Sequence, residues 1–346
     1  MMNRSWTIAA VAAGMAAVVG CTSAPIGNAG CGTSESASCM VCPKCSIEGM
    51  WAVDLPYDAM KAGWLKVEKG ADGKGAVTFL WRWASPFKVD EFAIAGNTLT
   101  FRMGAGKDKW RNFSFAARGS ELDCVETITD KDGKSLGSKS FKGKRIPPVD
   151  AAPDLTRAVY GAPIDLLAGG IDTWQSKEPE AHFGWTIKDG VLSNRIQRDE
   201  KGDGFGSNAN LISKRDDFFD FRLSYDVRVL PKCNSGVYLR GRYEIQVIDS
   251  YGKPVDCHNM AAFYGRITPK VAAEKKANEW QHVDVTLYKR HVTVVLNGEK
   301  IIDNQPVEGV TGGAIDSNDF VPGPIYLQGD HSDADYKNMY LTPILH

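Results

Sequence analysis

Apolar and polar residues alternate one by one through the C-terminal half of the chain, most regularly over residues 221–229. In that segment Phe, Leu, Tyr and Val take every second position, and Arg, Ser and Asp fill the positions between them. A period of two is typical of a β-strand with one buried and one polar face. At least eight strand-like segments follow one another with no long helical pattern between them. The C-terminal half is therefore expected to be all-β, as a two-sheet sandwich or jelly roll.

Tight turns punctuate these segments and extend the same organisation to the N-terminal half. Asp-Gly at 189–190 and Asn-Gly at 297–298 each join two apolar runs, which favours a β-hairpin. Similar runs and turns fill residues 46–148, where we expect a smaller antiparallel β meander or barrel. Its Gly-x-Trp opening at residues 49–51 resembles that of lipocalin-like barrels. Five tryptophans of this segment either form a sugar-stacking face or belong to the core or rim, and these are Trp51, Trp64, Trp81, Trp83 and Trp110.

Length and charge limit the classes of protein to consider. The 346 residues are enough for two domains with separate cores, and residues 149–156 have the composition of a linker between residues 46–148 and 157–346. The 41 Lys and Arg residues are balanced by 42 Asp and Glu residues. Proteins that bind nucleic acid usually carry a basic excess, so nucleic acid is not an expected partner.

The N-terminus has the pattern of an export signal. Arg4 precedes an apolar run over residues 6–20, which is shorter than the roughly 20 residues that cross a bilayer. The Val-Val-Gly-Cys ending resembles a bacterial lipobox, which implies a signal at residues 1–20 and a lipid on Cys21. Plain signal cleavage, with Cys21 incidental, is the alternative. We expect an exported protein of the bacterial cell envelope that contacts the membrane only through this lipid.

Eight cysteines are many for a reducing compartment. Besides Cys21, four of them lie in the segment at residues 21–45, which is expected to be a flexible tether, and these are Cys31, Cys39, Cys42 and Cys45. Local disulfides are the favoured interpretation, with a metal site or unpaired thiols as alternatives. Cys233 and Cys257 flank a strand pair and could form a disulfide with each other. Cys124 is expected to be a small buried residue.

Several central strands of the C-terminal half carry polar side chains that a sheet does not need for stability. On the alternation pattern we expect them to fill one concave face, and they are Asp226, Arg228, Tyr238, Arg240, Glu244, Gln246, Tyr326 and Gln328. Carboxylate, guanidinium, amide and phenol groups gathered in this way suit a ligand with many hydroxyl groups. The alternative is an ordinary solvated face with cross-strand ion pairs.

A longer set of segments between residues 160 and 346 resembles one known family. The segments are AGGIDTW, WTIKDGVL, DFRLSYDVRV, NSGVYLRG, YEIQVID, AAFYG, NEWQHV, LNGEKIID and GPIYLQGDH. In this order and spacing they are similar to the 3-keto-disaccharide hydrolase family, whose fold is a concanavalin A-like jelly roll. Two positions depart from the family pattern, because Asp226 stands where a glutamate is usual and Ser332 where a glycine is expected.

The resemblance implies an enzyme that cleaves 3-ketoglycosides, in which the glucose ring carries a ketone at C3. Such a ketone acidifies the C2–H bond, so a base can remove that proton and the C1 substituent can leave, with water added afterwards. Glu244 is the candidate base or metal ligand, with Arg240 and Gln246 as orienting groups or enolate stabilisers. His331 is the candidate acid or metal ligand, and His258 is the second choice. Asp226 and Gln328 are expected to support them.

Two questions stay open at this stage. A divalent metal ion is an option, although no ligand spacing in the sequence marks a site for it. A carbohydrate-binding module without catalysis is the alternative function on the same jelly roll, and a structural role in an extracellular assembly is a third.

Overall fold

The computed structural model describes residues 46–58, 60–70, 75–200 and 206–345. The expected signal, the lipidated Cys21 and the cysteines of the tether lie outside these ranges. The described residues form an all-β protein, as the sequence predicts, and its helices are two 3-10 turns at Leu155–Arg157 (η2) and Gly170–Thr173 (η3). Among the described residues, neither of these turns has the length or the apolar surface of a membrane span.

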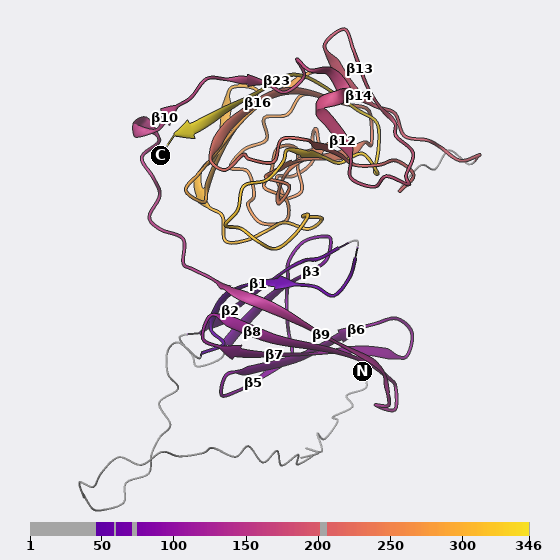
Figure 1. The fold of residues 1–346 in the computed structure, drawn as a ribbon, viewed down its shortest axis with the longest axis vertical. Helices are drawn as coiled ribbons and strands as arrows, with labels where there is room; N and C mark the ends of the chain where they lie inside the picture. The colour runs from indigo at the N-terminus through magenta and orange to yellow at the C-terminus, as the bar shows by residue number, and fades with distance from the viewer. Residues whose placement is uncertain (1–45, 59, 71–74, 201–205, 346) are drawn as a thin grey trace, which may run out of the picture. The chain divides into compact units, whose positions relative to one another are not determined.

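Nine strands make up the N-terminal sheet. They are β1 Gly49–Asp54, β2 Ala62–Lys69, β3 Gly75–Trp81, β4 Phe87–Lys88, β5 Phe92–Ala95, β6 Thr98–Gly104, β7 Lys109–Arg118, β8 Glu121–Asp130 and β9 Ser135–Ile146. Their order across the sheet is β4-β3-β2-β1-β9-β8-β7-β6-β5, and all neighbours are antiparallel (Figure 1). The two end strands, β4 and β5, follow each other in sequence, and no ladder joins them in the described chain. The sheet is therefore an open meander and not a closed barrel.

One face of this sheet forms an aromatic core. Phe79 lies at the centre, with its ring 5.3 Å from the rings of both Phe101 and Phe113 in edge-to-face geometry. Burial of one such side chain contributes roughly 1.5–3 kcal/mol, so the face is the main source of stability for the sheet. Trp51 and Trp64 are buried and Trp81 is partly buried, as a core or rim position requires, whereas Trp83 and Trp110 are 52% and 39% exposed.

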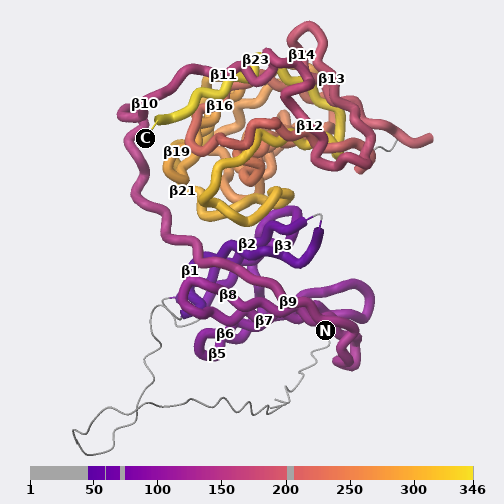
Figure 2. The backbone as a smooth tube through the Cα atoms, viewed as in Figure 1, coloured from indigo at the N-terminus to yellow at the C-terminus, as the bar shows by residue number. Residues whose placement is uncertain are grey.

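Two further sheets form the C-terminal sandwich. Its strands are β10 Val159–Tyr160, β11 Ile164–Asp165, β12 Trp174–Ser176, β13 Trp185–Lys188, β14 Val191–Asn194, β15 Leu211–Ser213, β16 Phe221–Val229, β17 Asn234–Leu239, β18 Tyr243–Ile248, β19 Gln281–Tyr288, β20 His291–Leu296, β21 Glu299–Pro306, β22 Tyr326–Leu327 and β23 Ala334–Leu345. The larger sheet has the order β13-β14-β23-β16-β19-β20-β21, with β10 and β11 paired to β23. The end of β23 therefore lies beside β10 (Figure 2). The smaller sheet has the order β12-β15-β22-β17-β18.

The alternating apolar residues of both sheets face each other and form one core. On β16 the five apolar positions from Phe221 to Val229 are buried, and on β18 the inward residues are Tyr243, Ile245 and Val247. Both predicted hairpins are present. Asp189 and Gly190 have φ of 51° and 74°, and Asn297 and Gly298 have φ of 52° and 91°. Such left-handed pairs match the twist of a two-residue hairpin, which is why Asp-Gly and Asn-Gly are favoured there.

The three described cysteines are unpaired. Cys124 is buried, as expected. The proposed disulfide between Cys233 and Cys257 is wrong. Cys233 is buried in the core of the sandwich, whereas the Cys257 sulfur lies 3.6 Å from the Nδ1 atom of His258 at a partly exposed position.

Candidate functional site

Two adjacent rows of side chains cross the smaller sheet of the sandwich on the face that points away from the core. In the first row Tyr238 of β17 pairs with Glu244 of β18 on one side and with Tyr326 of β22 on the other. In the second row Gly236 pairs with Gln246, and its carbonyl accepts a hydrogen bond from the backbone N–H of Gln328. Five of the sequence-predicted site residues therefore come together. These residues are Tyr238, Glu244, Gln246, Tyr326 and Gln328.

The first row is tightly ordered. The rings of Tyr238 and Tyr326 are stacked with centroids 4.2 Å apart. The Tyr238 hydroxyl donates a hydrogen bond of 2.8 Å to Glu244 Oε2 and also lies 3.1 Å from the carbonyl oxygen of Gly312. A Cβ atom at Gly236 would lie only 2.5 Å from Glu244 Oε1, so a glycine is needed there to leave room for the carboxyl group.

Burial controls the protonation of this row. The pKa of Glu244 is raised to about 8, mainly by desolvation and also by the charge of Asp330, and the hydrogen bond from Tyr238 opposes this increase. Desolvation also raises the pKa of Tyr238 and of Tyr326 well above 10. Both phenols therefore stay neutral hydrogen-bond donors, while Glu244 changes between its acid and carboxylate forms near neutral pH.

The row is buried, which corrects the expectation of an open hollow. Glu244 is 3% exposed, and Tyr238 and Tyr326 are similarly buried. The segment at residues 311–313 lies beside them, since the Thr311 hydroxyl accepts a hydrogen bond from the backbone N–H of Glu244. A ligand can therefore reach the buried row only past the partly exposed side chains next to it. These border residues are Lys177, Glu178, Gln328, Asp330 and His331.

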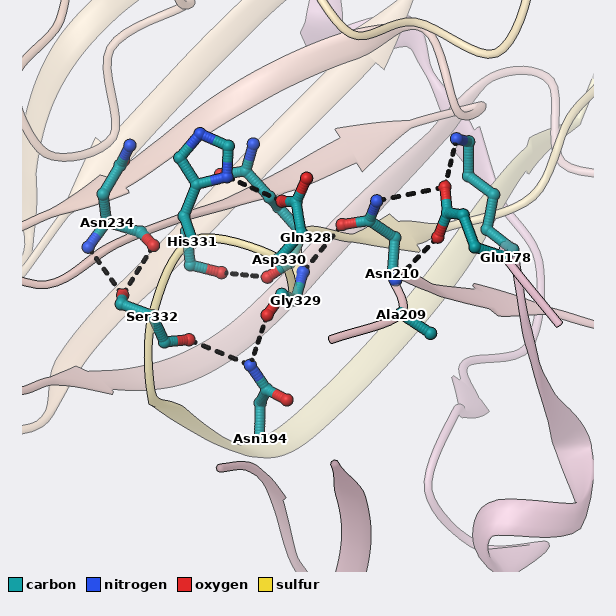
Figure 3. Close-up of polar contacts among 12 residues, drawn as sticks. Glu178, Asn194, Ala209, Asn210, Asn234, Gln328, Gly329, Asp330, His331 and Ser332 are labelled. Atoms are coloured by element: carbon teal, nitrogen blue, oxygen red, sulfur yellow. Dashed lines mark hydrogen bonds and ion pairs between the residues drawn. The ribbon is translucent and has the colours of Figure 1, made fainter. Parts of the chain in front are cut away.

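The loop after β22, residues 328–332, forms one side of this border and is held on both sides (Figure 3). Asn210 accepts a hydrogen bond from the Gly329 N–H at 2.8 Å and is itself bound to Glu178. The amide of Asn194 donates to the carbonyl oxygens of Gly329 and Ser332. The Ser332 hydroxyl also exchanges hydrogen bonds with the backbone of Asn234. The serine at the position where the family resemblance suggests glycine thus ties the loop to β17.

His331 and Asp330 form an ordered pair on this loop. The Nδ1 atom of His331 lies 2.6 Å from Asp330 Oδ1, and the imidazole is 26% exposed. A carboxylate at this distance orients the ring. The charge of Asp330 also acts on Glu244 and Tyr326. The carboxylate that orients His331 therefore also influences the buried row.

Gln246 and Gln328 differ in how their amides are used. Gln246 Oε1 accepts a hydrogen bond from the N–H of Val247 at 2.9 Å, so part of this side chain serves the backbone. Gln328 Oε1 is buried and has no hydrogen-bond partner among the described residues. An unpaired buried acceptor is costly unless a ligand or water satisfies it, so Gln328 fits a role in binding.

Arg240 is not part of this row, although alternation groups it with Tyr238. The strand ends at Leu239, and Arg240 has a left-handed φ of 52°, which breaks the alternation. Its guanidinium donates a hydrogen bond of 2.7 Å to the hydroxyl of Tyr243, whose side chain is on the core side of β18. It also lies over the ring of Phe219. The predicted enolate-stabilising role of Arg240 is therefore not supported by its position.

Asp226 and Arg228 lie on β16 of the larger sheet, and their side chains point outward from the sandwich. Asp226 accepts hydrogen bonds from Asn338 and contacts the His282 ring at 2.7 Å. Arg228 binds Asp335 and lies over the ring of Trp280. In a sandwich the apolar faces of the two sheets meet, so their polar faces point in opposite directions. Neither residue can share one hollow with Glu244.

His258 lies in a separate hydrogen-bonded group. Its Nε2 atom is 2.6 Å from the hydroxyl of Ser85, and its Nδ1 atom is bound to Asp256. Ser85 follows β3, so the N-terminal sheet contributes to this group. Tyr264 connects the two regions, because its ring packs edge-on against His258 and its N–H donates to the Glu244 carbonyl.

The residues present do not form a metal site around the buried row. Among the described residues, one group of three brings potential ligand atoms within 4.8 Å of each other, and it consists of Asp256, Cys257 and His258. Neither Glu244 nor His331 belongs to such a group. No chemical step is therefore assigned to a metal ion.

Several residues of the site were not found from the sequence, and they are Ser85, Lys177, Glu178, Thr311 and Asp330. They lie in loops or at strand ends, where no periodicity reports which way a side chain points. The one available signal was the Asp330-His331 dipeptide after a buried strand.

Comparisons with known proteins give one family match. Residues 164–342, more than half of the chain, match the 3-keto-alpha-glucoside-1,2-lyase-like domain. No curated protein matches the chain.

Solved structures that match part of the chain include two proposed glycosyl hydrolases from Parabacteroides distasonis. The first is 23% identical, with a TM-score of 0.41, over 57% of this chain and 92% of its own. The second is 21% identical, with a TM-score of 0.39, over 52% and 98%. The carbohydrate-binding module CBM66 from Bacillus subtilis is 15% identical, with a TM-score of 0.31, over 48% and 93%.

At these low TM-scores the assignment depends on the family match and not on the individual structures. The match begins at β11 and continues into β23, so it includes every strand of the smaller sheet and the buried row with Glu244. The chain therefore belongs to the family of 3-keto-alpha-glucoside-1,2-lyase-like domains.

Proposed function

We propose that the C-terminal sandwich cleaves 3-ketoglycosides by elimination across C1 and C2, with Glu244 as the base. Family membership supports a carbohydrate-acting enzyme as the general function. The observation that supports this particular chemistry is the buried Glu244 carboxyl group, whose pKa is raised to about 8. A carboxylate with a raised pKa is a stronger base than an exposed one, and removal of a proton next to a ketone needs such a base.

In the proposed reaction the Glu244 carboxylate takes the proton from C2, and the electron pair of the C2–H bond forms an enolate with the C3 ketone. The enolate then collapses, a double bond forms between C1 and C2, and the C1–O bond breaks. The leaving oxygen takes a proton from His331, which Asp330 holds in orientation. Addition of water across the new double bond completes a net hydrolysis.

The neutral phenol groups of Tyr238 and Tyr326 can stabilise the negative charge that develops during the reaction. Tyr238 already donates to Glu244, and it can shift its hydrogen bond as the carboxylate becomes protonated. Preorganised donors in a buried site stabilise an oxyanion more than water does, because they need no reorganisation during the reaction. Gln328, with its unpaired buried Oε1, is proposed to bind a sugar hydroxyl.

Aglycone release from a p-nitrophenyl 3-keto-glucoside, in both anomers, tests this proposal. We expect release from the keto substrate and none from the unmodified p-nitrophenyl glucoside, because only the ketone acidifies C2–H. The assay is run with and without a chelator. Absence of release under every metal condition, or equal release from both substrates, contradicts the proposed elimination. Saturable binding of an unmodified oligosaccharide without turnover would favour the carbohydrate-binding alternative.

The pH dependence gives a separate prediction. A base must be deprotonated, so the limb of the kcat/KM profile that reports Glu244 is expected to rise with pH up to about 8, whereas the acid His331 contributes an opposing limb. Initial rates between pH 6 and pH 9.5 measure this profile. A profile without the rising limb would remove Glu244 as the base.

We also propose that the chain is exported and anchored to a cell-envelope membrane through a lipid on Cys21. The signal-like pattern of residues 1–20 supports this. A Cys21→Ala variant expressed in a bacterial host should lose its labelling by radioactive palmitate and leave the membrane fraction.

A further inference from the structure

The N-terminal sheet carries a second polar and aromatic surface, on the face opposite its phenylalanine core. Strands β5 to β8 lie side by side there (Figure 1). The outward residues of β6, β7 and β8 pair in register, so that Arg102 lies next to Asn112 and Asn112 next to Thr127. Trp110 occupies the neighbouring outward position on β7 and pairs with Thr129. We call this face of β5 to β8 the Trp110 face.

The side chains of the Trp110 face are held in place before any ligand arrives. The guanidinium of Arg102 lies 4.5 Å from the centre of the Trp110 ring, which fixes the indole by a cation–π contact. The amide of Asn112 donates hydrogen bonds of 3.1 Å to the Thr127 carbonyl and to the Thr129 hydroxyl. A binding surface that is already ordered loses little conformational entropy when it binds.

The face is hollowed along its length. One hollow of about 530 Å³ runs from Phe92 and Ala93 toward Val125. A second hollow of about 320 Å³ reaches Trp110 and Thr129. The two hollows share the side chains of Arg102, Asn112 and Thr127. Together they form one open groove across β5 to β8, and an open groove suits an extended chain better than an enclosed monosaccharide.

The charges of the groove indicate what kind of chain it fits. Its charged lining residues are Glu91, Arg102, Asp130 and Lys131, which cancel to zero. Nucleic acids and anionic membrane surfaces need a basic excess, so neither matches this lining. The remaining polar groups are hydroxyls of Thr and Ser and the amide of Asn, which pair with neutral hydroxyl groups.

We infer that the Trp110 face binds a neutral polysaccharide chain. One sugar ring packs its apolar C–H face on the side of the Trp110 indole that does not contact Arg102, and hydroxyl groups of this and the next ring bind Arg102 and the Oδ1 atom of Asn112. This surface lies outside residues 164–342 and would hold the protein on a polymer while the sandwich acts on a separate sugar. The inference does not depend on the sandwich being catalytic.

Affinity electrophoresis of the full chain tests it, with soluble starch, dextran or barley β-glucan in the gel and alginate as the anionic comparison. We expect at least one neutral polymer to retard the wild-type protein. Loss of one stacking contact should weaken the apparent affinity of Trp110→Ala by about tenfold or more, with a smaller loss for Arg102→Ala. Trp83→Ala is the matched control, because Trp83 is also exposed and also lies under an arginine, Arg82, but outside the groove.

Circular dichroism and the melting temperature show whether each variant is folded. If Trp110→Ala does not fold, Trp110→Phe takes its place, because phenylalanine keeps an aromatic ring at this position. Three results would overturn the inference. The first is no retardation by any neutral polymer, and the second is equal retardation of wild type and Trp110→Ala. The third is a wild-type dimer in sedimentation that Trp110→Ala disperses, because the face would then be an interface between two copies.

Discussion

Glu244→Gln is expected to lower the turnover of a 3-ketoglucoside by about 10³-fold, because an amide cannot accept the C2 proton. The amide has nearly the same shape as the carboxyl group and can still accept the hydrogen bond of Tyr238, so the variant should fold and bind substrate. Steady-state rates with the p-nitrophenyl 3-keto-glucoside measure the effect. Glu299→Gln, at an exposed position on β21, is the control and should keep wild-type turnover.

The same variant should be more stable than the wild type at neutral and alkaline pH. The pKa of Glu244 is about 8 in the folded protein against a reference value of 4.5, so the folded state retains a proton that the unfolded state loses. Stability from this group is complete below pH 4.5, declines as the pH rises toward 8, and does not change further above it. Glutamine mimics the protonated form and removes this decline, which corresponds to about 3–5 kcal/mol at pH 8.

Urea unfolding at pH 5 and at pH 8 measures this difference. The wild type should lose stability between the two pH values relative to Glu244→Gln. A variant that keeps most of its turnover would remove Glu244 from the mechanism. A variant with normal binding, no turnover and an unchanged pH slope of stability would keep Glu244 as the base but contradict its raised pKa.

Arg242→Met is expected to destabilise the fold by about 2–3 kcal/mol, because it removes a buried guanidinium and leaves the carbonyl oxygens that it binds without a donor, whereas Asp316 is 37% exposed and can be solvated. The Arg242 side chain is 4% exposed and binds both carboxylate oxygens of Asp316 at 2.7 Å. It also donates to the carbonyl oxygens of Arg240 and Pro322. The contacts with Asp316 and Pro322 connect the turn between β17 and β18 to the loop at residues 316–322.

Arg222→Met is the matched control for this effect. Arg222 also pairs with an aspartate, Asp284, but its side chain is 50% exposed, so the loss should stay below about 1 kcal/mol. Urea denaturation of both variants provides the comparison. Equal losses would mean that burial of the Arg242 pair does not contribute to the stability of the sandwich.

Arg242→Met should also lower activity through the site. The carbonyl of Arg242 accepts hydrogen bonds from the N–H and the hydroxyl of Thr311, and that hydroxyl in turn accepts from the N–H of Glu244. Displacement of this segment would change the hydrogen bonds of the buried row. The expected result is a lower kcat for the variant, measured without urea under conditions in which the variant is folded.

The all-β class and the hairpins could be predicted because their signals are local. A period of two depends only on the direction of successive side chains, and Asp-Gly or Asn-Gly depends only on backbone angles within the turn. For the same reason alternation correctly grouped Glu244 with Gln246, since these residues lie two positions apart on β18.

The membership of each strand in one of the two sheets could not be predicted in this way. Asp226 and Arg228 have the same alternation as Tyr238, yet they belong to the larger sheet and point away from the site. Alternation gave the wrong position for Arg240, because the left-handed φ of this residue ends β17. Asp330 and Ser85 reach their positions through loops, whose course depends on hydrogen bonds to distant residues such as Asn210 and His258.

The amino-acid sequence by itself determined the strand pattern, the tight turns and, on β18, which residues share one face. The tertiary structure alone decided which polar side chains are buried together and that the pKa of Glu244 is raised. The physical reason is that hydrogen bonding within a turn acts between near neighbours, whereas desolvation depends on every segment that packs over a group.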